Sequence, residues 1–286
     1  MTSFFKYILT WFWRRLAAVA PVTGLAGVGI CTALAQGSAV APASNAPATG
    51  QSAAGGTGFV VVLDAAHGGD DVGGQLATSV AEKTVTLALS VRLRSLLTAR
   101  GFQVVTTREG NVSLDSVARA QIANHARAQA CLSIHASEAG SGVHIFVSSL
   151  PATEAARFLA WKTAQSAFVA RSLRLAGTVN SALEHASVAD GDAGDGSNGG
   201  SSAGPIPATL GRASLPGLDS MTCPAVAVEV APLRDADGKV LTEVTDPQYQ
   251  SQVVETLAAA LLEWKTDEET EIQVGPRSDS RRGRLP

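Results

Sequence analysis

Short apolar runs, each of strand length and hardly interrupted by polar residues, recur along the chain and constrain its fold more than any other feature. They are rich in valine, isoleucine and leucine, which is typical of strands buried on both faces of a sheet. Such a sheet needs helices on both of its faces to cover it. The predicted strands are Phe59–Leu63, Gln103–Thr107, Cys131–Ile134, Val143–Val147 and Ala225–Val230.

Segments with helical periodicity separate these runs. Between the first two strands, apolar residues recur at helical spacing until Arg100 and Gly101, which form a basic last turn and a glycine stop. Strands that alternate with helices predict an α/β fold: a single domain with a mainly parallel sheet flanked by helices on both faces. The other predicted helices are Ser113–Ile122, capped by its first residue, Lys162–Glu184 and Pro247–Trp264.

The N-terminal residues predict export. Lys6 and Arg14 precede an apolar run over residues 16–34, and small residues follow at its end. This pattern is typical of a secretory signal peptide, here residues 1–35. The run is also nearly long enough to span a bilayer, so an uncleaved membrane anchor is the alternative. In both cases we expect the rest of the protein in the periplasm or cell envelope.

Composition divides the remaining chain into segments. Residues 36–58 contain mainly alanine, glycine, serine and proline, which predicts a flexible linker. The folded domain is predicted over residues 59–265, with a mobile, glycine-rich loop over residues 187–204. Residues 266–286 lack apolar periodicity and are predicted to form a disordered tail.

Charge and aromatic content argue against a nucleic-acid partner. The formal net charge is −3, and only 5% of the 286 residues are aromatic. Such a chain offers neither a basic surface for phosphates nor many platforms on which bases can stack.

Two cysteines remain after a signal peptide is removed, Cys131 and Cys223. In an oxidising compartment they could form a disulfide. Because a disulfide tolerates only a narrow range of distances, we expect instead two separate, buried, small hydrophobic residues.

Two histidines follow predicted strands. His67 comes directly after the first strand and its short extension, and Gly68 and Gly69 let the chain turn tightly behind it. His135 ends a second strand in the same way. Because the carboxyl ends of parallel strands meet at one edge of a sheet, we expect both imidazoles at that edge. The pair indicates a metal site.

Two carboxylates complete the candidate site. Glu82 begins the helix that follows the His67 loop, although a glutamate in a first turn also suits the helix dipole. Glu229 lies in an apolar strand, where a charge is costly unless a metal or a salt-bridge partner is near. Asp64 could orient a metal ligand or simply accept hydrogen bonds from loop amides.

The succession of motifs LDAAHGGDDVGG, AEKTVTLALSVRLRSLLTARGFQVVTTRE, SLDSVARAQIANHARAQACLSIHAS, GVHIFVSS and PAVAVEVAPL resembles one known family. From about Phe59 to Trp264 the chain is similar to the zinc-dependent N-acetylmuramoyl-L-alanine amidases of the amidase-3 type. The resemblance implies that Zn²⁺ is bound by three residues and that a fourth is catalytic. The ligands would be His67, Glu82 and His135, and the catalytic residue Glu229.

The resemblance also implies a reaction and partners. The substrate would be peptidoglycan, cleaved at the amide between N-acetylmuramic acid and L-alanine during cell-wall remodelling or daughter-cell separation. Some family members are released from inhibition by a partner, so a regulatory activator protein is expected as well. The alternatives are a zinc peptidase that cleaves stem peptides and a non-catalytic regulator that binds the wall.

The chain departs from the family pattern in three loops. Ala65 and Ala66 replace the usual Pro-Gly pair, Ser137 replaces Asn or Asp, and Ala231-Pro232 replaces the Gly-Phe pair after the last glutamate. These changes remove no ligand, but we expect them to alter the loops around the metal. The remaining histidines, predicted to be surface or packing residues, are His125, His144 and His185.

Overall fold

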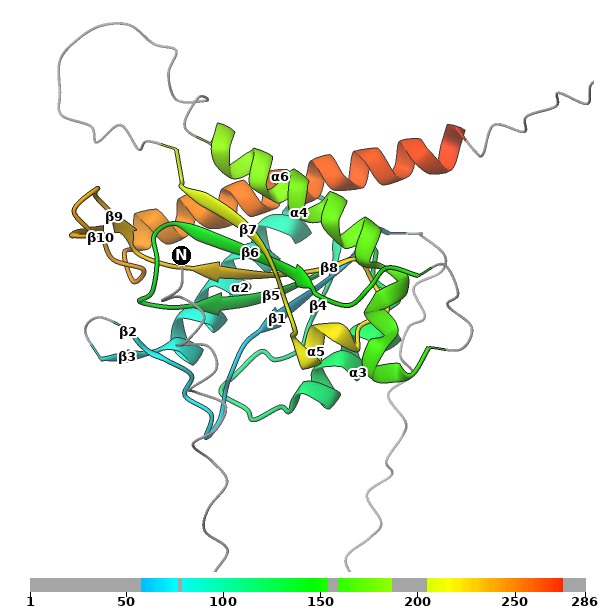
Figure 1. Cartoon of the computed structure of the whole chain (residues 1–286), viewed down its shortest axis with the longest axis horizontal. Coiled ribbons are helices and arrows are strands. Elements are labelled where there is room, and N and C mark those ends of the chain that lie inside the picture. The colour runs from blue at the N-terminus through cyan, green and yellow to red at the C-terminus, as the bar shows by residue number, and fades with distance from the viewer. Residues whose placement is uncertain (1–57, 77–78, 154–158, 187–204, 275–286) are drawn as a thin grey trace, which may run out of the picture. The chain divides into compact units, whose positions relative to one another are not determined.

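A six-stranded sheet forms the centre of the fold (Figure 1). In spatial order the strands are β4 (Gln103–Thr106), β1 (Val60–Ala65), β5 (Ala130–Ala136), β8 (Ala225–Val230), β6 (Val143–Ser148) and β7 (Ala208–Ala213). The first four run parallel to one another, β6 is antiparallel to β8, and β7 is parallel to β6. The prediction of a mainly parallel sheet is therefore confirmed.

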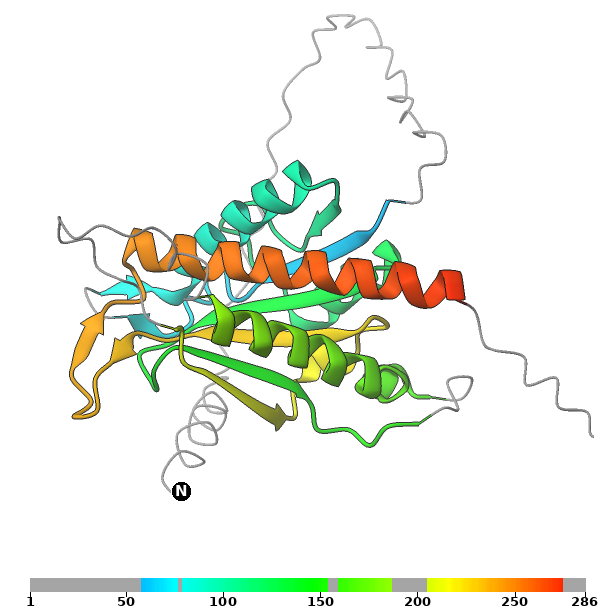
Figure 2. The same cartoon turned by 90° about the horizontal axis from the view of Figure 1, so that it is seen from above.

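Helices cover both faces of the sheet, as predicted. The larger apolar core lies between one face and three long helices, α2 (Glu82–Ala99), α4 (Val169–His185) and α6 (Pro247–Val274). Figure 2 shows α6 lying between the other two, in agreement with the contacts that it makes with both. A smaller core on the opposite face includes residues of α3 (Ser116–Ala126) and α5 (Pro216–Asp219).

The computed structural model describes residues 58–76, 79–153, 159–186 and 205–274. The predicted signal peptide, nearly all of the predicted linker and the predicted mobile loop lie outside these residues. Within them, no helix combines the length and the apolar character that crossing a lipid bilayer requires.

Two small strand pairs lie beside the main sheet. Figure 1 shows both on the side where β8 ends. The first pair falls between His67 and α2, and the second follows Glu229. Their strands are β2 (Gln75–Leu76), β3 (Val80–Ala81), β9 (Leu233–Arg234) and β10 (Val240–Thr242).

Two predicted helices differ in the structure, and one strand of the main sheet was not predicted. The helix predicted over residues 162–184 is a 3₁₀-helix, η2 (Trp161–Ala167), followed by α4. The cap of α3 is Asp115 rather than Ser113, because the Asp115 side chain accepts a hydrogen bond from the amide of Ala118 at 2.7 Å. The unpredicted strand is β7, whose residues are half-exposed or exposed and form no apolar run.

The prediction of a disordered tail from residue 266 is wrong as far as Val274, where α6 ends. Ion pairs with α4 explain the longer helix: Arg171 and Arg174 both pair with Glu268, and Arg174 also pairs with Glu271 at 3.0 Å. Partners on another helix can stabilise a turn that lacks an apolar stripe of its own. Residues 275–286 lie outside the described part of the chain.

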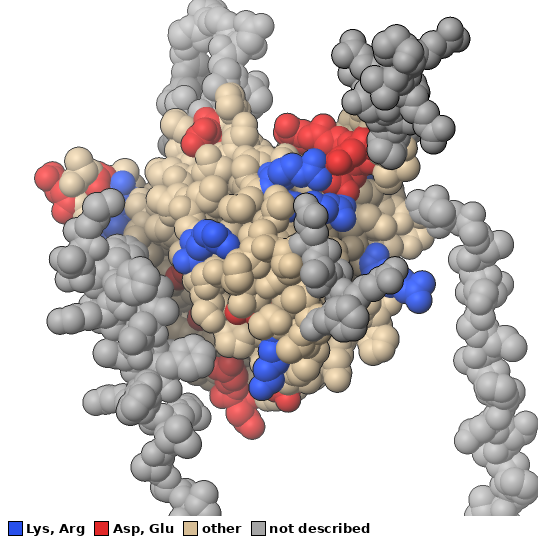
Figure 3. All heavy atoms as spheres, turned by 45° about the vertical axis from the view of Figure 1, so that its right-hand side comes forward, with Lys and Arg blue, Asp and Glu red and all other residues tan. Residues whose placement is uncertain are grey.

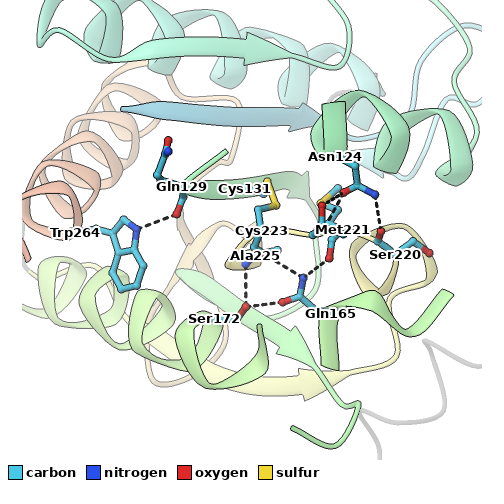
Figure 4. The surroundings of a disulfide bond; sticks show 11 residues. Asn124, Gln129, Cys131, Gln165, Ser172, Ser220, Met221, Cys223, Ala225 and Trp264 are labelled. Atoms are coloured by element: carbon cyan, nitrogen blue, oxygen red, sulfur yellow. Dashed lines mark hydrogen bonds between the residues drawn. A yellow bond between two sulfur atoms is a disulfide. The ribbon is translucent and has the colours of Figure 1, made fainter. Parts of the chain in front are cut away.

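The expectation of two separate cysteines is also wrong, because Cys131 and Cys223 form a disulfide (Figure 4). Cys131 lies at the start of β5, and Cys223 lies just before β8, the neighbouring strand. The register of these strands brings the two Cα atoms to 6.2 Å, within the range that a disulfide needs. Gln165 donates hydrogen bonds to the carbonyls of Met221 and Cys223 and thereby holds the second cysteine in place.

Candidate metal and catalytic site

The topology of the sheet brings the predicted site residues together. The strands β1, β5 and β8 are neighbours and parallel, so their carboxyl ends meet at one edge. His67 follows β1, His135 is near the end of β5, and Glu229 is near the end of β8. The helix α2 begins at the same edge with Glu82. Ligand sites of open α/β sheets occur at such an edge.

Glu82 lies between the two histidines. Its Oε2 is 3.1 Å from Nε2 of His67, and its Oε1 is 3.2 Å from Nδ1 of His135. The two imidazole rings are nearly perpendicular, with centroids 5.5 Å apart. One donor atom from each of the three residues lies within 4.8 Å of the other two. This distance is short enough for the three side chains to hold one metal ion.

The carboxylate of Glu82 is kept ionised although it is buried. Burial alone favours its neutral form, but hydrogen bonds with His135 and His67 outweigh burial and lower the pKa of Glu82 far below its usual range. Burial likewise opposes protonation of His67, but the hydrogen bond with Glu82 prevails and raises the pKa of His67. The amides of Gly74 and Ala136 also donate to Glu82, at 2.8 and 3.2 Å.

Asp71 is a functional candidate that the sequence analysis missed. Its Oδ2 lies 2.9 Å from Nδ1 of His67, the ring nitrogen that does not contact Glu82. A carboxylate on the second nitrogen fixes the tautomer and orientation of a metal-binding histidine. The sequence signal was the acid pair Asp70-Asp71 directly after the two glycines, but only the fold shows which acid turns back to His67.

Asp64 does not have either of its predicted roles. Its carboxylate accepts hydrogen bonds from the hydroxyls of Thr107 and Ser133, at 2.7 and 2.9 Å, and forms an ion pair with Arg119 at 2.7 Å. All of these groups are buried. Asp64 therefore links the end of β1 to its neighbouring segments through Thr107, Ser133 and Arg119.

The Ala65-Ala66 pair is held by side chains. Arg108 donates to the carbonyls of both alanines, at 2.8 and 2.9 Å, and Arg119 donates to the carbonyls of Ala65 and His67. Both guanidinium groups are buried. These bonds fix the path of the loop where the chain lacks the Pro-Gly pair expected from the family pattern.

The glycines after His67 have the predicted role. Gly68 and Gly69 both have positive φ, +131° and +60°. A Cβ atom on Gly68 would lie 2.3 Å from the carbonyl oxygen of Val112, and one on Gly69 would lie 2.0 Å from Oγ of Ser113. Only glycine permits both the conformation and the close approach at these positions.

Glu229 lies next to His135 in the sheet. The two residues are direct partners in the parallel register of β5 and β8, so their side chains are on the same face. Glu229 is half-buried, in contrast to the fully buried strand residues before it. The site therefore combines two imidazoles and a bridging carboxylate with a second carboxylate on the adjacent strand.

Comparisons with known proteins agree with this arrangement. Residues 61–263 match the sequence model of the family described as N-acetylmuramoyl-L-alanine amidase. The N-acetylmuramoyl-L-alanine amidase AmiA of Escherichia coli (strain K12) is 33% identical over 134 residues, which are 47% of this chain and 46% of AmiA. A putative N-acetylmuramoyl-L-alanine amidase of Buchnera aphidicola is 37% identical over 94 residues, which are 31% of this chain and 43% of that protein. The matched part is thus less than half of each relative.

Solved structures share the fold over most of the described chain. The amidase Ami1 of Mycobacterium smegmatis superimposes with a TM-score of 0.54 at 21% identity, covering 73% of this chain and 98% of Ami1. The catalytic domain of the amidase CwlV of Bacillus (Paenibacillus) polymyxa gives 0.52 at 23% identity, covering 72% and 98%.

Proposed function

Because this chain belongs to the N-acetylmuramoyl-L-alanine amidase family, we propose that it hydrolyses the amide between N-acetylmuramic acid and L-alanine in peptidoglycan. The observation that carries the proposal is the meeting of His67, Glu82 and His135 at one sheet edge, with Glu229 on the neighbouring strand. A non-catalytic relative would not need to keep all four groups together.

The donor set fits zinc. Two imidazole nitrogens and one carboxylate are a common ligand set of catalytic zinc, which keeps a further position open. His67, Glu82 and His135 would hold the ion, and the ionised state of Glu82 supplies negative charge toward it. The chemistry that zinc supplies when bound is polarisation of a carbonyl group and acidification of water.

Glu229 supplies the proton transfers in the proposed reaction. As a carboxylate it removes a proton from the attacking water, and as the resulting acid it returns that proton to the departing amine of L-alanine. Water adds to the carbonyl carbon, the carbon–nitrogen bond breaks, and no covalent enzyme intermediate forms. His135 and Glu229 are direct register partners, which keeps the base beside the metal ligands.

The proposal extends to the biological setting. We assign the described residues to a catalytic domain that acts after export, in the periplasm or cell envelope, on cell-wall remodelling or daughter-cell separation. The CwlD amidase of Clostridioides difficile has been solved in complex with the GerS lipoprotein. A regulatory activator protein is therefore part of the proposal for this chain.

Digestion of purified peptidoglycan tests the reaction. The amidase reaction releases peptides with a free L-alanine amino terminus and leaves intact glycan strands, which mass spectrometry of the products identifies. Cleavage inside the peptides would instead establish a peptidase. Stoichiometric zinc without any product would establish a non-catalytic binder.

The Glu229→Gln variant tests the assigned base. We expect turnover to fall by about 100-fold or more, because the amide cannot accept a proton, while zinc content stays at the wild-type level. Activity is measured by product release and zinc by elemental analysis. Glu263→Gln, which makes the same change on an exposed turn of α6, is the matched control and should keep full activity. Near-normal activity of Glu229→Gln would remove this residue from the mechanism.

A further inference from the structure

A row of polar side chains continues from the site toward the edge of the sheet. His144 on β6 is the antiparallel partner of Glu229, and Thr209 on β7 is the parallel partner of His144. Because directly paired residues share a face, His135, Glu229, His144 and Thr209 all lie on one face in strand order. His144 is thus on the opposite side of Glu229 from the metal-binding candidates.

Only one of the two ring nitrogens of His144 has a hydrogen-bond partner among the described residues. Its Nδ1 lies 2.7 Å from the hydroxyl oxygen of Thr209. Its Nε2 is buried and has no hydrogen-bond partner among the described residues. Buried polar nitrogens are nearly always hydrogen-bonded, and an unpaired one at a site is a candidate for contact with a ligand.

A short loop covers this nitrogen. Gly140 in the loop between β5 and β6 lies so close that a Cβ atom would be 2.2 Å from Nε2 of His144, and its φ is +87°. Arg234 holds the loop, since its Nε donates to the carbonyl of Gly140 at 3.0 Å and its Nη2 to that of Glu138 at 2.9 Å. The cover is therefore a glycine segment held by polar contacts, and contact between Nε2 and a ligand requires this segment to shift.

We propose that His144 is a substrate-binding residue for the stem peptide. Its Nε2 would donate a hydrogen bond to a backbone carbonyl among the first residues of that peptide. This inference rests on the proposed amidase function. The scissile carbonyl belongs at the His67 and His135 end of the row, and the departing nitrogen belongs at Glu229, which protonates it. The peptide bonded to that nitrogen then continues toward β6, where His144 lies.

Thr209 sets the hydrogen-bonding character of the ring. When its hydroxyl donates to Nδ1, the neutral imidazole carries its proton on Nε2. Nε2 is then a donor, which suits a peptide carbonyl as acceptor. In this state the pair offers one donor to the peptide on the leaving side of the amide.

Two substitutions distinguish the roles of the two ring nitrogens of His144. The amide of His144→Asn reaches the position of Nδ1 and keeps the contact with Thr209, whereas the longer amide of His144→Gln reaches the position of Nε2. With a muramyl peptide as substrate, we expect His144→Asn to raise KM by about fivefold and to keep kcat within twofold. This is the effect of losing one hydrogen bond that binds the ground state and the transition state equally. His144→Gln keeps a hydrogen-bond donor at the position of Nε2, so its KM should lie between those of the wild type and His144→Asn. An unchanged KM for His144→Asn would overturn the proposal, and so would equal losses in both variants accompanied by a lower Tm.

A binding measurement keeps this test apart from the test of the amidase reaction. In the Glu229→Gln background, adding His144→Asn should raise the Kd for a muramyl peptide by about fivefold, as measured by calorimetry. The Kd for N-acetylmuramic acid without a peptide should not change. Equal Kd values for the muramyl peptide would overturn the subsite even if amidase products form. If the wild type forms no such products, the amidase proposal fails while the Kd ratio still reports on His144.

Discussion

At the scale of single residues, two carboxylates fix the orientation of the His67 ring. Glu82 contacts one ring nitrogen of His67 and Asp71 contacts the other, at 3.1 and 2.9 Å. The imidazole therefore cannot turn without breaking one of the two contacts. Glu82 is buried, whereas the side chain of Asp71 is 60% exposed. The exposed acid can be changed with little effect on packing, which makes its role separable from that of the core.

The Asp71→Asn variant tests this orienting role. We expect the affinity for zinc to fall roughly 10- to 100-fold, because the amide no longer favours the tautomer that directs Nε2 toward the metal. Competition with a chelator measures the affinity, and thermal unfolding of the metal-free protein checks that the fold is unchanged. Asp70→Asn is the matched control, since Asp70 is exposed and its backbone amide, not its carboxylate, contacts Ser113. Equal loss in both variants would assign the effect to net charge alone.

At the scale of elements, the strands β5 and β8 connect the disulfide with the candidate site. One end carries the disulfide between Cys131 and Cys223, and the other carries His135 and Glu229. Figure 4 shows the hydrogen bonds that surround the disulfide: Gln165 bonds the carbonyl of Cys223, and Ser172 bonds both Gln165 and the amide of Ala225. The disulfide therefore fixes the register of the strands at the end remote from the site.

Removal of the disulfide should cost stability without loss of the metal. The bridge closes a loop with a sequence separation of 92 residues. For the double variant Cys131→Ala/Cys223→Ala we expect the free energy of unfolding to fall by about 2–5 kcal/mol, since its unfolded chain is less constrained. Urea unfolding measures the change, and elemental analysis should still find wild-type zinc. Reductant during unfolding should destabilise the wild type and leave the double variant unchanged; equal sensitivity of both would contradict the assignment.

At the scale of the whole molecule, an apolar sheet covered by helices supports a charged site at its edge. On the face drawn in Figure 3, most of the surface consists of residues that are neither acidic nor basic, and the charged side chains form small separate groups. A surface of this kind exerts little long-range attraction on a charged partner.

The stability of the whole chain should depend on pH in opposite ways with and without metal. Without metal, Glu82 stabilises the fold above its unfolded pKa of 4.5, and this contribution is lost as pH falls toward its lowered folded pKa. His67 stabilises the fold below its unfolded pKa of 6.5, and this contribution is lost as pH rises through its raised folded pKa. We therefore expect the metal-free protein to be most stable between these two values.

Zinc should reverse the trend at higher pH, because it binds neutral imidazoles. Urea unfolding from pH 4.5 to 8, in chelator and in excess zinc, measures both curves. The difference between them should grow with pH. In His67→Gln the decline of the metal-free curve above pH 6.5 should weaken; an unchanged decline would show that other groups cause it.

The periodicity of the sequence predicted every strand of the main sheet except β7, its longer helices and the edge where the histidines meet. Burial on two faces imposes local patterns, and the ends of adjacent parallel strands must lie together. His67, Glu82, His135 and Glu229 could be selected because each occupies a strand end or a helix start. Their roles as ligands and base stay predictions until the proposed variants are measured.

Only the tertiary structure decided the features whose partners are distant in the sequence. The half-exposed strand β7 needs β6 beside it, the end of α6 needs the arginines of α4, and the disulfide needs the register of β5 with β8. Asp71 and His144 gained their candidate roles in the same way, through contacts with His67 and Thr209. Local patterns report burial, whereas hydrogen bonds and ion pairs depend on which segments the fold brings within a few ångströms.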